Sequence, residues 1–203
     1  MKRIGILGGT FNPIHKGHIM LAREAYEQYP LDAVLVMPNK IPAYKDTKDI
    51  VDTVHRGNMV QLAIQMYPYM EYSDLELKRE GETYTIHTLY ELHNMHPDTI
   101  YYFIIGGDSL AYLNKWYQHK NILREAIILC ARRGEDDFEE LKSYRSSLLK
   151  EVPEAQIEFL QTDMVNISST ELRTRLKEGQ DVSEWVSDSV LSYIKKHHLY
   201  EAS

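Results

Sequence analysis

The sequence predicts an α/β protein: a doubly wound, Rossmann-like, mostly parallel sheet with helices on both faces and a helical C-terminal part. Three observations support this. Apolar runs alternate with amphipathic segments, and this alternation is typical of parallel sheets, whose crossovers are helices. The apolar runs are nearly continuous, as in strands that are covered on both faces. A glycine turn directly follows the first run.

The expected strands are four short apolar runs, and amphipathic helices are expected between them. The strands cover residues 4–7, 33–37, 100–105 and 126–131, and the helices cover residues 18–29, 53–66 and 85–93. The polar segment 38–49 is longer than most connections, so we expect it to be functional.

The C-terminal third is expected to be helical. A polar break at 132–137 precedes a helix over 138–149, and the chain is helical again from Ile167, with Gly179 as a stop. An amphipathic closing helix uses Val190, Leu191, Ile194 and Leu199. We see no domain boundary, so residues 1–203 are predicted to form a single domain.

Composition limits the classes of function. The chain has 203 residues with 43% hydrophobic and 26% charged residues, as expected for a globular protein. Its formal net charge of −7 argues against nucleic acid as a partner. No signal-peptide pattern and no long apolar run is present, so we expect no membrane partner and a cytoplasmic location. The single cysteine, Cys130, lies in an apolar run and is expected to be buried.

Residues 8–18 read Gly-Gly-Thr-Phe-Asn-Pro-Ile-His-Lys-Gly-His and carry much of the polar chemistry. Gly8 and Gly9 allow the backbone to approach an anion closely. His15 and His18 share one face of a helix that should begin near Lys16, at its positive end. This pattern predicts a phosphate site, although it fits neither the G-x-G-x-x-G motif nor the P-loop. The alternative is a structural turn with one core histidine.

Residues 166–175 form a second candidate anion site. Ser168 and Glu171 have the spacing of a capping box, which predicts a helix start. Helix amides, adjacent hydroxyls and Arg173 could bind phosphate oxygens. Alternatively, these residues only cap the helix.

Together the two segments resemble those of nucleotidyltransferases in which H-x-G-H follows a G-x-F-x-P turn and I-S-S-T-x-x-R comes later. His15, Lys16, Gly17 and His18 match the first motif, and Ile167, Ser168, Ser169, Thr170 and Arg173 match the second. Residues 82–89 and 105–117 further resemble the S-Y-T-x-D-T-L and I-G-x-D-S-L…W-Y segments of bacterial nicotinate mononucleotide adenylyltransferases. The resemblance extends over essentially the whole chain.

The resemblance implies a single nucleotidyltransferase domain that transfers the adenylyl group of ATP to nicotinate mononucleotide, giving nicotinate adenine dinucleotide and pyrophosphate in NAD synthesis. It implies catalytic roles for His15, His18 and Arg173. The ATP-binding residues would be Gly8, Gly9, Thr10, Phe11, His15, His18, Gly106, Asp108, Ile167, Ser168, Ser169, Thr170 and Arg173. The mononucleotide-binding residues would be Asn39, Lys45, Tyr84, Thr85, Asp108, Trp116 and Tyr117. We expect Mg²⁺ to be carried by the ATP phosphates without a protein metal site. A homo-oligomer is compatible with the sequence.

Several alternatives stay open. The acceptor could be nicotinamide mononucleotide or phosphopantetheine, or the chain could be a sensor that binds ATP without catalysis. Trp116 could be a core residue, and Asp108 could cap a helix that begins at Ser109. Three residues depart from the family pattern: Asn12 replaces a usual aspartate, Tyr44 a usual histidine, and His87 a usual aspartate.

Overall fold

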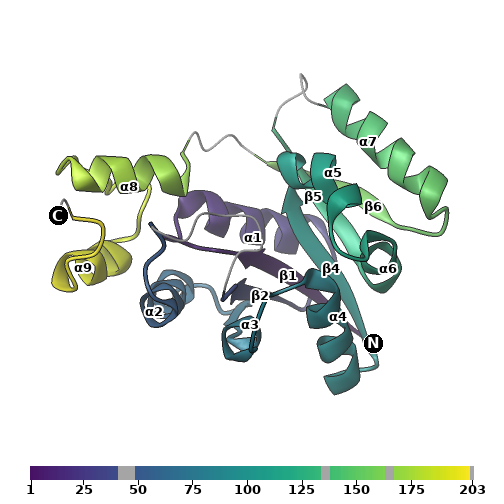
Figure 1. Cartoon of the computed structure of the whole chain (residues 1–203), viewed down its shortest axis with the longest axis horizontal. Helices are drawn as coiled ribbons and strands as arrows, with labels where there is room; N and C mark the ends of the chain where they lie inside the picture. Colours follow the sequence, from purple (N-terminus) through teal and green to yellow (C-terminus); the bar gives the residue numbers. More distant parts are fainter. Residues whose placement is uncertain (41–48, 134–137, 163–166, 202–203) are drawn as a thin grey trace.

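The computed structural model describes residues 1–40, 49–133, 138–162 and 167–201. Its centre is a six-stranded parallel sheet in the order β3-β2-β1-β4-β5-β6 (Figure 1). The strands are β1 (Lys2–Gly9), β2 (Ala33–Pro38), β3 (Met70–Tyr72), β4 (Thr99–Gly106), β5 (Ile127–Arg133) and β6 (Ile157–Thr162). The predicted fold class is confirmed.

Helices connect the strands and cover both faces of the sheet (Figure 1). They are α1 (Lys16–Gln28), α2 (Thr53–Ile64), α3 (Leu75–Lys78), α4 (Thr85–Met95), α5 (Gly107–Tyr112), the 3₁₀ helix η1 (Leu113–Lys115), α6 (His119–Glu125), α7 (Phe138–Glu151), α8 (Ser169–Lys177) and α9 (Asp188–Lys196). In Figure 1, α8 and α9 lie with α2 at the end of the molecule that holds the C-terminus. None of the helices in the described ranges is long and apolar enough to span a membrane.

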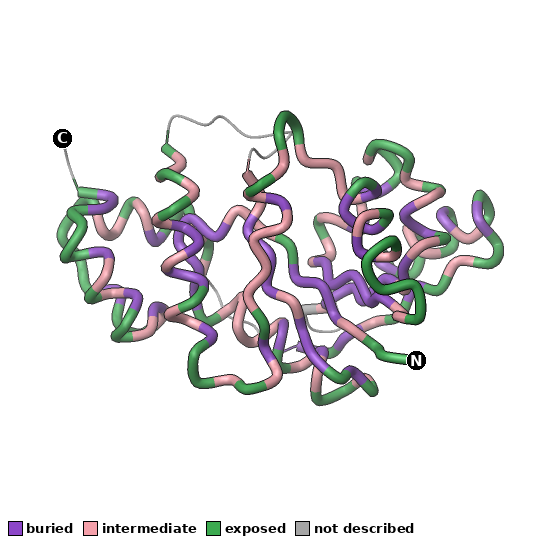
Figure 2. The backbone as a smooth tube through the Cα atoms, turned by 90° about the horizontal axis from the view of Figure 1, so that it is seen from below, coloured by how far each residue is buried: buried purple, intermediate pink, exposed green. Residues whose placement is uncertain are grey.

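Two apolar cores lie on the two faces of the sheet because side chains alternate along each strand. Leu7 and Ile104 belong to a core shared with α1, α2, α8 and α9. Their neighbours Ile6 and Phe103 belong to a core shared with α4, α5, α6 and α7. Figure 2 shows buried residues mainly in the interior of the molecule and exposed residues mainly on its outer turns. Cys130 is fully buried in the second core, and burial raises the pKa of its thiol to about 12.

The structure adds two strands that the sequence patterns did not predict. β3 has only three residues, too few to show a period. β6 lies at the edge of the sheet and contains exposed Glu158 and Gln161 beside buried Ile157 and Leu160, so it lacks a continuous apolar run. The alternative role of Asp108, as the cap of a helix that begins at Ser109, is not found, because α5 begins at Gly107 and Asp108 lies in its first turn.

The strand order places a switch point between β1 and β4. From β1 the chain continues to β2 on one side, and from β4 it continues to β5 on the other side. In such sheets, ligands bind beyond the carboxyl ends of the strands at the point where the order reverses. β1 ends at Gly9 and β4 ends at Gly106. The fold thus places two glycines of the predicted site at one edge.

Candidate active site

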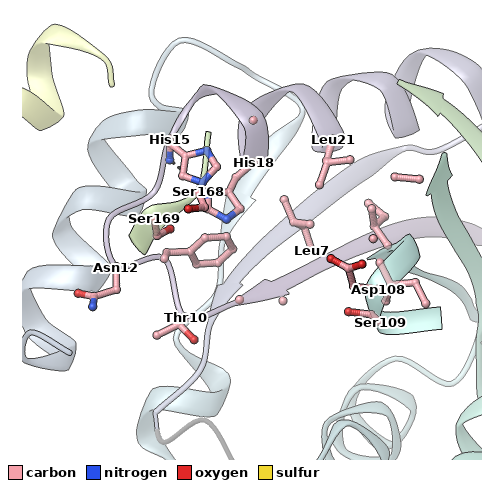
Figure 3. Close-up of a pocket in the computed structure, with 18 of the residues that line it drawn as sticks. Leu7, Thr10, Asn12, His15, His18, Leu21, Asp108, Ser109, Ser168 and Ser169 are labelled. Atoms are coloured by element: carbon pink, nitrogen blue, oxygen red, sulfur yellow. Dashed lines mark hydrogen bonds between the residues drawn. The ribbon is translucent and has the colours of Figure 1, made fainter. Parts of the chain in front are cut away.

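A pocket of about 840 Å³ opens at this switch point. Such a volume lies within the usual range of small-molecule sites. Its walls come from the carboxyl ends of β1 and β4 and from the starts of α1, α5 and α8. Figure 3 shows His15 and His18 on one side of this pocket and Asp108 and Ser109 on the other.

The glycine turn after β1 is shaped by the packing of Phe11. A Cβ atom on Gly9 would lie 2.9 Å from Cε1 of Phe11, so only glycine leaves room for this ring. Phe11 is 1% exposed and adopts a positive φ of 48°. Its ring meets His18 edge to face at a centroid distance of 5.0 Å. The buried phenyl ring therefore supports the imidazole at the start of α1.

The two histidines form the first turn of α1, with His15 at the N-cap position. The backbone N–H of His15 donates to Nδ1 of His18 over 3.2 Å. Because Nδ1 accepts this bond, the neutral imidazole carries its proton on Nε2. The two rings lie 3.8 Å apart between centroids. His18 can thus present an N–H donor at the positive end of a helix.

The start of α8 packs against the same turn. The hydroxyl of Ser169 donates to the carbonyl of Pro13 over 3.0 Å, and Nη1 of Arg173 donates to the carbonyl of Asn12 over 3.0 Å. Nη2 of Arg173 also lies 3.4 Å from Oγ1 of Thr170. The fold therefore brings the two predicted anion sites together into one.

Ser168 is the N-cap of α8, as the sequence predicts. Its hydroxyl accepts a bond of 3.1 Å from the backbone N–H of Glu171. The carboxylate of Glu171 pairs with Arg175 at 2.6 Å. The serine half of the expected capping box is present, while the glutamate stabilises the next helical turn.

Every residue that was expected to bind ATP lines the pocket, and so do all three expected catalytic residues. These are Gly8, Gly9, Thr10, Phe11, His15, His18, Gly106, Asp108, Ile167, Ser168, Ser169, Thr170 and Arg173. Their shared location supports a nucleotide site.

The residues expected to bind the mononucleotide are divided. Asp108 and Trp116 line the pocket, whereas Asn39, Tyr84, Thr85 and Tyr117 do not. Lys45 and Tyr44 lie outside the described residues. Trp116 is half-buried and also meets Phe103 edge to face at 6.1 Å, so it has a packing role as well as a place in the pocket.

Two of the residues that are expected to bind the mononucleotide form an aromatic cluster with His87 outside the pocket. Tyr84 and Tyr117 lie 4.7 Å apart between ring centroids, and His87 meets both rings edge to face. Thr85 is the first residue of α4, as predicted. Oδ1 of Asn39 is buried and has no hydrogen-bond partner within the described ranges.

The pocket also contains residues that the sequence analysis did not select. They are mainly apolar and lie near the ends of strands or on α1: Leu7, Met20, Leu21, Phe103, Ile104, Ile105, Ala131 and Thr162. Asp49, Ile50 and Ser109 also line the pocket. The carboxyl-end rule could have identified the strand residues. Asp49 ends the segment 38–49 that is expected to be functional, but only a tertiary contact shows that it reaches this pocket: Nδ2 of Asn12 donates to the carbonyl of Asp49 over 2.8 Å.

Comparison with known proteins gives the family. The model of the cytidylyltransferase-like family matches residues 6–175. A Lachnoclostridium phytofermentans protein named probable nicotinate-nucleotide adenylyltransferase is 44% identical over 200 residues, which cover 98% of this chain and 100% of the relative. A Bacillus cytotoxicus protein of the same name is 38% identical over 203 residues and covers 100% of both chains.

A solved structure has the same fold. The Plasmodium falciparum nicotinic acid mononucleotide adenylyltransferase complexed with NaAD aligns with a TM-score of 0.81 at 24% identity, over 98% of each chain. With the family model and the full-length relatives, the conclusion is direct: the chain belongs to the cytidylyltransferase-like family and, within it, to the nicotinate-nucleotide adenylyltransferases.

Proposed function

We propose that this protein transfers the adenylyl group of ATP to nicotinate mononucleotide, producing nicotinate adenine dinucleotide and pyrophosphate for NAD biosynthesis. One observation carries the proposal most strongly. The two motifs that are expected to bind phosphate meet in a single pocket, where Arg173 contacts the turn that leads to His15 and His18. Relatives that match the chain over its full length have the corresponding name.

The reaction needs no general base. A phosphate oxygen of the mononucleotide attacks the α-phosphorus of ATP, one P–O bond forms, and the P–O bond to the β-phosphate breaks as pyrophosphate leaves. A phosphomonoester with a second pKa of about 6 is already largely ionised at neutral pH. The enzyme must therefore align two anions that repel each other and stabilise charge on the transferred and leaving groups.

The donors of the pocket suit this task. Nε2–H of His18 can bind an α-phosphate oxygen, and His15 lies beside it at the same helix start. Arg173 keeps donors beyond those used for Asn12 and Thr170, since a guanidinium carries five N–H groups. With the hydroxyl of Ser168 and the free amides of α8, it would bind the β- and γ-phosphates.

Mg²⁺ would arrive with the triphosphate and neutralise part of its charge. The polar residues of the lining fit this arrangement, because most of them can donate to phosphate and only Asp49 and Asp108 are carboxylates. In the part of the chain that the structure describes, no group of three or more His, Cys, Asp or Glu could hold a metal ion.

The acceptor side supports the acid over the amide. Trp116 in the pocket can stack on a pyridine ring. The free amides at the start of α4, next to Thr85, offer donors to a carboxylate, whereas the amide mononucleotide would bring its own donors to them. We propose that the enzyme acts in the cytoplasm, where both substrates are available.

Pyrophosphate release tests the proposal. The purified protein is assayed with ATP and Mg²⁺ plus one acceptor at a time: nicotinate mononucleotide, nicotinamide mononucleotide or phosphopantetheine. We expect release with the acid mononucleotide and much slower release with the others. Equal rates for acid and amide would contradict the selectivity, and saturable ATP binding without release under any condition would favour a sensor.

A further inference from the structure

Arg56 is a buried cation in α2, at a position that the sequence analysis did not select. It is 1% exposed and is among the largest fully buried side chains. Its guanidinium donates three hydrogen bonds to main-chain carbonyls. Nη1 donates to Thr10 over 2.7 Å, Nη2 to Lys40 over 3.1 Å, and Nε to Val51 over 3.2 Å.

These three carbonyls belong to three different segments, and the pocket is lined by Thr10 itself and by Asp49 and Ile50, which directly precede Val51. Thr10 lies in the glycine turn after β1, Lys40 follows β2, and Val51 precedes α2. The ends of β1 and β2 are also joined directly, because the N–H of Asn39 donates to the carbonyl of Gly9 over 2.9 Å. One guanidinium thus fixes the phosphate-binding turn relative to the residues on either side of segment 41–48.

The charge of Arg56 is not explained by an ion pair. Within the described residues, no carboxylate lies within ion-pair distance of its guanidinium. Burial lowers the pKa of Arg56, although Tyr200 and Asp52 act in the opposite direction. Burying a cation costs free energy, and the three hydrogen bonds to carbonyls offset that cost. Removing the guanidinium would leave these carbonyls without their donor, so a loss of stability is expected in any variant and has to be separated from an effect on catalysis.

We propose that Arg56 is a positioning residue for adenylyl transfer, which aligns the turn carrying His15 and His18 with the acceptor side of the pocket through the carbonyls of Thr10, Lys40 and Val51. The role rests on the proposed function. The planar fork is essential to it, because one guanidinium reaches three carbonyls in fixed directions. A lysine keeps the charge but is a compact ammonium without this geometry.

Two variants test the role, Arg56→Lys and Arg56→Met. Each is assayed for pyrophosphate release with saturating substrates, at a temperature well below the midpoint of its own thermal unfolding. Loss of alignment lowers the rate of the chemical step more than the binding of ATP. We expect kcat to fall about fivefold or more in both variants, while KM for ATP changes by less than about threefold.

Two control variants separate positioning from general destabilisation. Leu148→Ala removes a buried side chain of α7, on the opposite face of the sheet, and should lower the melting temperature without lowering kcat. Arg124→Lys changes an exposed arginine that pairs with Glu154 at 2.8 Å and should have no effect on kcat.

The outcomes are distinct. A decrease in kcat of less than about fivefold for Arg56→Lys, or a rise in KM for ATP at unchanged kcat, would overturn the positioning role. If Arg56→Met does not fold, Arg56→Lys decides alone, because it retains the charge and most of the volume. Failure of the wild-type protein to release pyrophosphate would instead refute the proposed function.

Discussion

The guanidinium of Arg173 donates a hydrogen bond of 3.0 Å to the carbonyl of Asn12, and this contact joins segments that are 161 residues apart in the sequence. Asn12 is itself 3% exposed. Its Oδ1 accepts from the hydroxyl of Tyr200 over 2.8 Å and from the N–H of Val51 over 3.2 Å. The turn of the first motif is therefore held by the second motif, by the segment before α2 and by the C-terminus.

Arg173→Lys should impair catalysis strongly. A lysine cannot contact the carbonyl of Asn12 and also offer further donors to phosphate in a planar array. Removal of one preorganised donor to developing charge typically lowers kcat by about 100-fold, and we expect a decrease of this order in pyrophosphate release. Arg175→Lys is the matched control, since Arg175 lies on the same helix, pairs with Glu171 and does not line the pocket. Similar rates for the two variants would contradict the role of Arg173.

His18→Asn separates the structural and chemical roles of this histidine. Oδ1 of asparagine can replace Nδ1 as acceptor for the N–H of His15, so the start of α1 should persist. The Nε2 donor is lost, because the asparagine side chain is too short to replace it. We expect a melting temperature close to that of the wild type and a decrease in kcat of about 100-fold or more. Thermal unfolding and pyrophosphate release are measured on one preparation, and a variant that retains full kcat would exclude a phosphate contact by His18.

The sequence predicts much of this fold because its strong patterns are local. A strand covered on both faces is continuously apolar, as in 100–105, and the structure has β4 there. The edge strand β6 and the three-residue β3 show no such run, so local patterns do not reveal them. Helix starts were predicted well where a side chain caps them, as at Ser168.

The residues that are expected to bind phosphate can be selected from the sequence because they lie in two compact motifs, and the structure places both motifs in one pocket. The residues that hold this pocket together cannot be selected in that way. Arg56 lies on an amphipathic helix and is indistinguishable in sequence from a solvated arginine, yet it is 1% exposed. Tyr200 comes from the C-terminal segment, and only the tertiary fold places its hydroxyl on Asn12.

Gly106→Val should block ATP without disturbing the fold. A Cβ atom at Gly106 would meet nothing within 4 Å, and its φ of −82° and ψ of 166° suit a β-branched residue. Because Gly106 lines the pocket, the added side chain would occupy ligand volume. We expect KM for ATP to rise by about tenfold or more, since one lost or blocked contact of 1.4 kcal/mol changes affinity tenfold.

Gly107→Ala is the contrasting variant for this test. Its Cβ atom would lie 3.1 Å from Cδ2 of Leu141, and Gly107 does not line the pocket. We expect this variant to unfold at a lower temperature but to keep its KM for ATP. If Gly106→Val binds ATP as tightly as the wild type by titration, the ligand does not occupy the space above Gly106.

Glu76→Gln should change the pH dependence of stability. Glu76 is 9% exposed and its Oε1 accepts a bond of 2.7 Å from the hydroxyl of Thr88. Burial raises the pKa of this carboxyl above its ordinary value, although the bond from Thr88 and the charge of Arg79 oppose the shift. The folded state therefore binds the proton more tightly than the unfolded state. As the pH rises from the unfolded pKa through the folded pKa, the wild type loses stability because the buried carboxyl must ionise.

Glutamine keeps the acceptor for Thr88 but does not titrate. We therefore expect Glu76→Gln to have a larger free energy of unfolding than the wild type at pH 7, with the difference shrinking below the unfolded pKa of about 4.3, where both side chains are neutral. Urea unfolding of both proteins across this range measures the difference. A wild type that is more stable than the variant at pH 7, with no change in the difference at lower pH, would contradict a burial cost for the ionised carboxylate.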